Sequence, residues 1–311
     1  MNHFHTKYRY FTPKHYDVKR NLIFINIASY RDPLCYKTIN SIYENAKWPD
    51  NIRIGLCIQD IFHKCETNEY SRYIKTIKLN YTSAKGPTWA RYLCNTLWDG
   101  EEYFLQIDSH TSFVKNWDSD IINMLSYLPK KSIITYYPPN IGSPGNIKNI
   151  TVHTISAHIN ERNHIISKSK RVPSTDKPHA AYFISCGFLF CKSQFIIDVP
   201  WDPYLPYLFQ GEESLLTMRA FTNGWVLFHP CHAVCYHYYY RKNEPRFWTD
   251  LYKYYTLYNP LSNKRAKYFL KLENKDTKYP NIYLYEEVFG PGYTKSINEW
   301  FSFFQPFLTT F

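Results

Sequence analysis

The sequence predicts an α/β protein in which helices flank a mostly parallel central sheet, and three observations support this class. Short apolar runs alternate along the chain with segments whose apolar residues recur at helical spacing, which is the pattern of β-α-β units. The strongest run stops abruptly at polar residues, as a buried strand does at the edge of a sheet. With 311 residues, of which 44% are hydrophobic, the chain can bury a sizeable core.

The first part of the chain has the pattern of one β-α-β unit. Residues 22–28 form a strongly β-prone run, after which Pro33 suits the first turn of a helix and Asp32 its N-cap. Apolar residues at helical spacing follow over 39–46, and residues 52–58 alternate as a second strand. A right-handed crossover makes these strands parallel, and α/β sheets receive nucleotides at the carboxyl ends of such strands.

The next unit carries a candidate anion site. Residues 73–79 are expected to form another strand, and Gly86-Pro87 marks the start of a helix with one apolar face. Lys85 and Arg91 lie near that helix start, where backbone N–H groups and cations together favour an anion. The structural alternative is that Arg91 is a solvated helix residue, which is more common for an isolated arginine.

A candidate metal site follows the strongest strand signal, the apolar run 103–107. Asp108, Ser109 and His110 end that run. On an extended backbone Asp108 and His110 project to the same side, and a carboxylate oxygen beside an imidazole nitrogen suits Mn²⁺, Mg²⁺ or Zn²⁺. The alternative is that Asp108 only caps a turn and His110 lies on the surface, because an isolated D-x-H pair often occurs by chance.

The second half of the chain begins with a helix and a strand over 132–137, followed by a polar excursion over 138–181. This excursion has the composition of a long loop with a hairpin near 152–157, and long loops in compact domains are often functional lids. Regular structure resumes over 184–190, where Gly187 allows a ligand or another backbone to approach closely.

Two adjacent acids and a late histidine are further candidates. Glu212 and Glu213 begin a predicted helix, where acidic side chains also have the simple role of complementing the macrodipole. Residues 226–229 and 234–239 are expected to be strands, and the second of these carries His237.

Composition narrows the class of partner. The net charge of +11 favours anionic partners, but basic residues are scattered and no nucleic-acid-binding motif occurs, so no nucleic-acid partner is expected. The 8 cysteines include no C-x-x-C pair, which argues against a structural zinc site. Neither a secretory signal nor a bilayer-spanning apolar run is visible, so we expect a cytoplasmic protein without integral membrane association.

Several of these segments resemble the motifs of one family, the GlcNAc-transferases typified by the cytoplasmic Skp1-hydroxyproline N-acetylglucosaminyltransferase. The matching blocks are 27–32, 86–91, 106–110, 116–118 and 211–213. They occur in order between about residues 22 and 241, and a weaker match over 290–300 resembles the C-terminal segment of the family.

The resemblance implies a GT-A glycosyltransferase fold with a Rossmann-like sheet, and metal-dependent transfer of a sugar from a UDP-sugar with retention of configuration. Asp108 and His110 match the D-x-H metal motif of the family, and His237 is the best match for the histidine that completes the coordination. His232 is the reserve candidate for that ligand. Mn²⁺ is the favoured cofactor, with Mg²⁺ as the alternative.

The resemblance also assigns donor-binding and catalytic residues. The donor-binding candidates are Ala28, Ser29, Tyr30, Arg31, Lys85, Arg91, Asp108, Ser109, Gly187 and Arg241. The catalytic candidates are Glu212 and Glu213, which would contact sugar hydroxyls or the acceptor, with a slight preference for Glu213. One position departs from the family, because Ser185-Cys186-Gly187 stands where the family has Gly-Gly.

The expected organisation is an N-terminal tail over 1–20, a catalytic domain over 21–241 that includes the 138–181 excursion, and a small C-terminal extension over 242–311. The favoured reaction transfers GlcNAc from UDP-GlcNAc to the hydroxyl of hydroxyproline or another hydroxylated residue of a protein.

Three alternatives stay open. The enzyme could use UDP-Gal, UDP-Glc or UDP-GalNAc on a protein or glycan acceptor. A non-catalytic sugar- or nucleotide-binding protein is a second alternative, although the complete set of candidate metal ligands argues against it. The third is a metal-dependent hydrolase of sugar nucleotides, which would usually need further clustered carboxylates that the sequence does not show.

Overall fold

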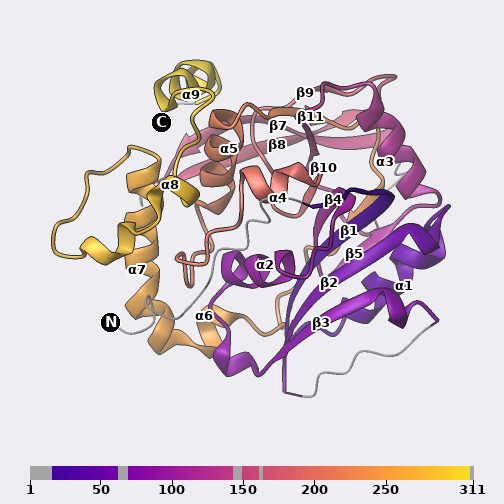
Figure 1. Cartoon of the computed structure of the whole chain (residues 1–311), viewed down its shortest axis with the longest axis horizontal. Helices are drawn as coiled ribbons and strands as arrows, with labels where there is room; N and C mark the ends of the chain where they lie inside the picture. The colour runs from indigo at the N-terminus through magenta and orange to yellow at the C-terminus, as the bar shows by residue number, and fades with distance from the viewer. Residues whose placement is uncertain (1–15, 62–68, 143–148, 161–163, 309–311) are drawn as a thin grey trace.

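The computed structural model describes residues 16–61, 69–142, 149–160 and 164–308, and an eight-stranded sheet runs through the middle of them (Figure 1). The spatial order of the strands is β3-β2-β1-β4-β10-β6-β11-β9. Their bounds are β1 (Lys19–Tyr30), β2 (Ile52–Gln59), β3 (Ile74–Leu79), β4 (Glu101–Asp108), β6 (Ser132–Thr135), β9 (His179–Ala180), β10 (Phe188–Lys192) and β11 (Val226–His229).

The predicted parallel arrangement holds for most of this sheet. β3, β2, β1 and β4 are parallel neighbours, and β6 is parallel to β11. β10 is antiparallel to both β4 and β6, and the short edge strand β9 is antiparallel to β11. The carboxyl ends of the parallel strands therefore share one edge of the sheet, where α/β proteins bind their ligands.

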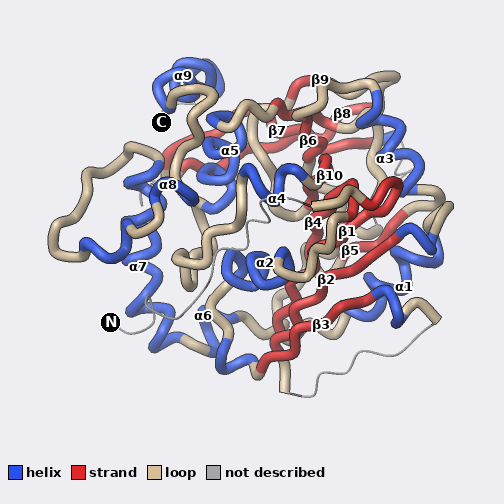
Figure 2. The backbone as a smooth tube through the Cα atoms, viewed as in Figure 1, coloured by secondary structure: helices blue, strands red, loops and turns tan. Residues whose placement is uncertain are grey.

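Helices cover both faces of the sheet, which explains why its strands are almost continuously apolar (Figure 2). Ile23, Ile25 and Ile27 of β1 pack in one core cluster with α1 and α3, whereas Phe24 points to the opposite face and packs with α2, α4 and α5. These helices are α1 (Cys35–Asn45), α2 (Pro87–Asn95), α3 (Trp117–Ser126), α4 (Gln194–Asp198) and α5 (Glu212–Thr222).

The other described strands form two two-stranded sheets. β5 (Thr111–Phe113) pairs with β12 (Cys235–His237), and β7 (Ile150–Ile159) pairs with β8 (Ile165–Pro173). The hairpin expected near 152–157 is thus confirmed and is longer than the sequence pattern indicated. Residues 143–148 and 161–163 of the polar excursion lie outside the described residues.

Several strand and helix boundaries differ from the predictions, among them those near Cys186, His237 and Leu34. The strand expected over 184–190 begins only at Phe188, since the N–H groups of Ser185 and Cys186 donate to side-chain oxygens. The strand expected over 234–239 ends at His237. Helix α1 has Leu34 and not Asp32 as its N-cap, although Asp32 Oδ1 accepts the Leu34 N–H at 2.9 Å.

The C-terminal part of the chain forms a helical layer that packs beside α5 (Figure 1). Its helices are α6 (Phe247–Asp250), α7 (Tyr252–Phe269), α8 (Glu286–Phe289) and α9 (Ile297–Phe304). Among the helices that the structure describes, none combines the length and hydrophobicity needed to cross a bilayer.

A buried ion pair joins α7 to the loop before α5. Arg265 and Asp202 have side chains that are 0% and 1% exposed, and Arg265 Nε donates to Asp202 Oδ2 at 2.7 Å. The Arg265 guanidinium also donates to the carbonyl of Ile282 at 2.6 Å. One side chain therefore connects three separate segments of the chain.

We expect Arg265→Met to lower the free energy of unfolding by about 3–5 kcal/mol, because it leaves the Asp202 carboxylate buried without its partner. Lys264→Met is the matched control, since the Lys264 side chain is 39% exposed and its pair with Asp276 lies near the surface. That control should change the stability by less than about 1 kcal/mol in urea unfolding. Equal effects of the two substitutions would contradict this account.

Candidate active site

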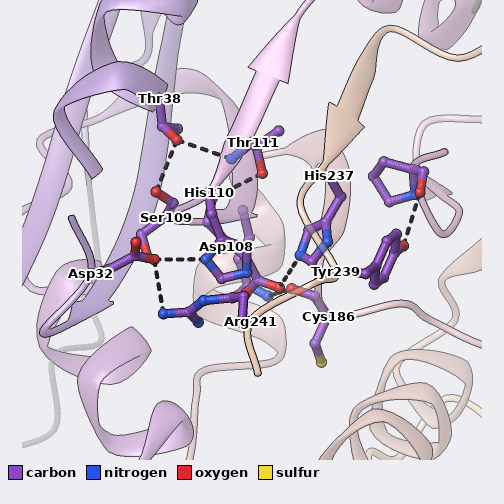
Figure 3. Close-up of polar contacts among 12 residues, drawn as sticks. Asp32, Thr38, Asp108, Ser109, His110, Thr111, Cys186, His237, Tyr239 and Arg241 are labelled. Carbon is purple, nitrogen blue, oxygen red and sulfur yellow. Dashed lines mark hydrogen bonds and ion pairs between the residues drawn. The ribbon is translucent and has the colours of Figure 1, made fainter. Parts of the chain in front are cut away.

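Three candidate metal ligands from two distant parts of the sequence meet at the carboxyl edge of the sheet (Figure 3). Asp108 ends β4, His110 precedes β5, and His237 ends β12. Ligand atoms of the three side chains all lie within 4.8 Å of one another, and His237 Nε2 is 3.1 Å from Asp108 Oδ2. The antiparallel pairing of β12 with β5 places His237 there, since it aligns His237 with Thr111.

Asp32 orients the His110 ring by its contact with Nδ1 (Figure 3). Asp32 Oδ2 lies 2.7 Å from His110 Nδ1, accepts the Ser109 hydroxyl at 2.6 Å, and is 3.4 Å from Arg241 Nη2. Burial alone would raise the pKa of Asp32, but His110, Arg241 and Ser109 together lower it below its usual range. Because Nδ1 of His110 is engaged, Nε2 is the nitrogen left for a metal, an arrangement typical of metal-binding histidines.

Arg91 is buried and binds three groups of the site, so its interpretation as a solvated helix residue is wrong. Its Nη2 lies 3.3 Å from Asp108 Oδ1 and donates to the Cys186 carbonyl at 3.3 Å, and its Nη1 lies 3.9 Å from Glu212 Oε1. Loss of water around Asp108 raises the pKa of that carboxyl, but His237 and the Arg91 cation lower it more, so Asp108 stays ionised.

A buried network that the sequence did not reveal holds Arg91 in place. Gln106, which is fully buried within β4, donates to the Cys186 carbonyl at 2.8 Å and accepts the indole N–H of Trp201 at 2.7 Å. The Trp201 ring lies 5.1 Å from the Arg91 guanidinium, within cation–π distance. The polar side chain of Gln106 interrupts the apolar run 103–107 of β4, and this interruption was the signal available in the sequence.

The two adjacent glutamates have different surroundings. Glu213 accepts the Tyr137 hydroxyl at 2.7 Å and the Cys186 N–H at 2.9 Å, so both of its oxygens are occupied. Glu212 Oε2 is buried and has no hydrogen-bond partner among the described residues. Burial raises the pKa of Glu212 to about 8, against the opposing effect of Arg91, and burial also raises the pKa of Glu213.

These side chains border a cavity of about 410 Å³. Of the donor-binding candidates, the lining includes Ala28, Tyr30, Arg91, Asp108, Ser109, Gly187 and Arg241. Both glutamates and both histidines of the cluster also line it. A Cβ on Gly187 would lie 3.3 Å from Asp108 Oδ2, so the group that approaches this glycine within the chain is a side chain.

The remaining candidates lie outside this lining. Ser29 is buried within β1, and Lys85 places its ammonium 5.3 Å from the Trp89 ring. Arg31 forms an ion pair with Asp250 at 2.7 Å, which ties the β1 loop to α6. His232, the reserve candidate for the third metal ligand, also lies outside the cluster. Its Nε2 lies 3.4 Å from Asp120 Oδ2.

Several residues of the cavity lining come from a region that the sequence patterns did not indicate. Glu244, Arg246, Phe247 and Trp248 follow His237 in the chain and close one side of the cavity. No described residue of the 138–181 excursion contributes to the lining. The basic and aromatic composition of 241–248 was the signal available for this region.

The chain is similar to known glycosyltransferases. A family model described as Glycosyltransferase (GlcNAc) matches residues 22–71 and 61–306, whereas no curated protein matches significantly. The crystal structure of GalNAc-T7 with UDP, GalNAc and Mn²⁺ is 14% identical, with a TM-score of 0.52 over 93% of this chain and 58% of that chain. TarS of S. aureus in complex with UDP-GlcNAc is 13% identical, with a TM-score of 0.45 over 84% of this chain and 78% of that chain. The present chain therefore has the GT-A glycosyltransferase fold and spans less than two thirds of that GalNAc-T7 chain.

We expect Asp32→Asn to weaken Mn²⁺ binding by about 10–100-fold, because His110 loses the carboxylate that orients its ring. Isothermal titration of Mn²⁺ into the purified protein measures the affinity. Asp250→Asn is the matched control, since Asp250 also pairs with an arginine but lies outside the cluster. If the two variants bind Mn²⁺ equally, Asp32 does not orient a metal ligand.

Proposed function

The chain belongs to the GlcNAc glycosyltransferase family, and from that premise we propose that it catalyses metal-dependent transfer of a sugar from a UDP-sugar to an acceptor hydroxyl. The observation that carries the proposal is the cluster of Asp108, His110 and His237 on the wall of the 410 Å³ cavity. The favoured donor is UDP-GlcNAc, in keeping with the family, and UDP-Gal, UDP-Glc and UDP-GalNAc are the alternatives.

The donor set fits a divalent transition metal. One carboxylate oxygen and two imidazole nitrogens suit Mn²⁺ better than Mg²⁺, which prefers oxygen ligands and retained water. When bound, the cation would neutralise charge on the diphosphate leaving group. Asp32 supports this assignment, because it holds the His110 ring through Nδ1 at 2.7 Å.

Two arginines on the cavity wall are suited to the diphosphate. Arg91 is fixed between Asp108 and Glu212, and Arg241 is held 3.4 Å from Asp32. A guanidinium that is already oriented loses little conformational freedom when it binds phosphate oxygens. We therefore assign these two side chains to the phosphates, in agreement with their place among the donor-binding candidates.

The nucleoside would bind at the carboxyl ends of β1 and β2. Ala28, Tyr30 and Gln59 line the cavity there, at the position where parallel sheets receive nucleotides. Arg31 would act indirectly, since its ion pair with Asp250 and its contact with the Tyr81 ring at 4.6 Å fix the loop that carries Tyr30.

We assign different roles to the two acids. Glu212, with one buried and unpartnered oxygen, would contact the sugar or the acceptor hydroxyl, whereas Glu213 would position the Cys186 loop beside Asp108. For the catalytic role we therefore prefer Glu212, whereas the sequence slightly favoured Glu213. Retention of configuration, as the family resemblance implies, requires no protein base, because the leaving phosphate can take the proton of the acceptor.

The proposed acceptor is a hydroxyl group of a protein or of a glycan. The resemblance favours hydroxyproline or another hydroxylated residue of a protein, and a glycan hydroxyl is the alternative. A non-catalytic sugar-binding protein would retain the cavity but release no UDP, and a hydrolase would release UDP without a need for an acceptor.

The proposal is tested by UDP release from UDP-GlcNAc in Mn²⁺, with and without hydroxyl-bearing peptides. We expect Asp108→Asn to abolish turnover, because it removes a ligand charge with little change in shape. Asp99→Asn is the matched control, since Asp99 is an exposed acid paired with Lys19 and Lys75. Wild-type turnover by the Asp108 variant after chelation and Mn²⁺ addition would falsify the metal assignment.

We expect Glu212→Gln to lower kcat at least about a hundredfold, which corresponds to roughly 2.7 kcal/mol of barrier. Glu213→Gln should mainly lower the melting temperature, because it disturbs the hydrogen bonds to Tyr137 and Cys186. Steady-state kinetics and thermal melting of both variants separate the two roles. The assignment fails if Glu212→Gln turns over normally.

Glu212→Gln also tests how the pH affects the stability of the metal-free protein. With its pKa raised to about 8 in the folded state, Glu212 keeps a proton that the unfolded chain releases near its ordinary pKa. The contribution of Glu212 to stability should therefore fall as the pH rises from about 5 to about 8. Glu212→Gln lacks this titration, so its melting temperature should gain on that of the wild type across the same window.

A further inference from the structure

Three histidines outside the candidate active site meet where the β7–β8 hairpin lies against the edge of the main sheet (Figure 1). His153 belongs to β7, His179 to β9 and His229 to β11. The rings of His153 and His229 are stacked, with centroids 4.1 Å apart and an interplanar angle of 3°. The His179 ring lies 5.1 Å from that of His153. The proposed transferase function uses none of these residues, which together are called the histidine cluster.

We propose that the histidine cluster is a pH-sensitive latch, which holds the open end of the β7–β8 hairpin on the main sheet at neutral pH and releases it in acid. The open end consists of the paired residues 151–154 and 169–172. This role is independent of the proposed sugar transfer.

The two ends of the hairpin are held by different forces. Near the turn, Ala157 and Ile165 are buried in a hydrophobic cluster with residues of α5, α7 and α9. At the open end, the described side chains that are buried are those of Thr151 and Thr154, which are polar. Thr154 contacts the histidine cluster directly, since its Oγ1 lies 3.3 Å from His229 Nε2. The attachment of the open end therefore depends on polar groups.

The surroundings of His229 fit its neutral form. The residue is 1% exposed, and its Nδ1 lies 3.1 Å from the carbonyl oxygen of Thr135. Because a carbonyl can only accept, Nδ1 carries the proton and Nε2 is left to accept the Thr154 hydroxyl. Protonation of Nε2 would remove that acceptor and would place a positive charge against the His153 ring.

His153 is also placed to stay neutral. Its Nε2 is buried and has no hydrogen-bond partner among the described residues, so a proton there would make a buried donor without an acceptor. Two charged rings in the stack would also repel each other. In agreement, burial and His179 lower the pKa of His153 to about 4. Burial, followed by His153 and His179, lowers the pKa of His229 to about 3, against the opposing effect of Thr135 and Thr154.

The other charged groups around the cluster do not offset this effect. From β8, the cation Lys170 stands opposite His153 in the strand pairing. From β6, Thr135 contributes its carbonyl oxygen and no charge. Asp120 and Asp176 act on Cys231, the thiol beyond β11, whose pKa is raised first by burial and then by these two acids.

Acid should favour the released hairpin. Once exposed to water, the histidines would titrate near their ordinary pKa of 6.5, well above their values in the closed latch. The released form therefore binds more protons than the closed form. The latch is fully closed above about pH 7 and weakens as the pH falls from about 6.5 toward about 4.

Hydrogen exchange followed by mass spectrometry measures the opening of each end of the hairpin. We expect the protection factors of residues 151–154 and 169–172, corrected for the intrinsic pH dependence of exchange, to fall at least about tenfold from pH 7.5 to pH 5.0. Those of residues 157–159 and 165–166 should change less than about threefold, because apolar packing holds that end. An equal loss at both ends, or no loss at the open end, overturns the latch.

A matched pair of variants tests whether the histidine cluster causes the response. His153→Phe keeps a flat ring on His229 but cannot be protonated, so its loss of protection should be at least about fivefold smaller than that of the wild type. His232→Phe is the control, since it removes a histidine that lies beside Asp120 and outside the cluster, and it should keep the full response. His153→Gln replaces the first variant if thermal melting at pH 7.5 shows that it is unfolded. A full response in the His153 variant, or a lost response in His232→Phe, overturns the assignment of the latch to the cluster.

Discussion

The site depends on how the protein compensates the carboxylate of Asp108 at the carboxyl end of a central strand. Arg91 and His237 approach its two oxygens, at 3.3 Å and 3.1 Å, and both favour the ionised form. Arg91 can do this only because it is itself buried among acceptors, which include the Cys186 carbonyl and Glu212. The charges are therefore arranged as one connected set, and a change in any member alters the surroundings of the others.

The supporting structure keeps this set in a single geometry. Gln106 and Trp201 hold the Cys186 carbonyl and the Arg91 guanidinium from one side of the sheet, and Asp32 holds His110 from the other side. The β5–β12 pairing then delivers His237. Oriented side chains of this kind lose little entropy when a metal or phosphate binds, which is the physical basis for assigning a donor site here.

The C-terminal helices have a second role in addition to completing the fold. The Arg265–Asp202 pair anchors α7 in the core, and the Arg31–Asp250 pair connects α6 to the loop after β1. Phe209 and Trp248 consequently stand between two cavities whose walls belong to different parts of the chain. The two cavities, one of about 410 Å³ at the candidate active site and one beside α7, thus share a wall that depends on the position of the extension.

The sequence by itself indicated most strands of the sheet and the flanking helices α1, α2, α3 and α5, because apolar periodicity and the stop at Asp108 are local properties of the chain. It indicated neither the edge strand β9 nor α4. It also indicated the candidate ligands Asp108 and His110, which lie two residues apart, and the family resemblance supplied His237. Only the tertiary structure decided that Arg91 is buried, that Asp32 binds His110 and that the two glutamates differ, because these depend on contacts between residues far apart in the chain. The sequence also could not indicate two strand boundaries. Near Cys186, a side chain from α5 binds the backbone N–H group that the strand would have used. At His237, the pairing stops because the partner strand β5 begins at Thr111.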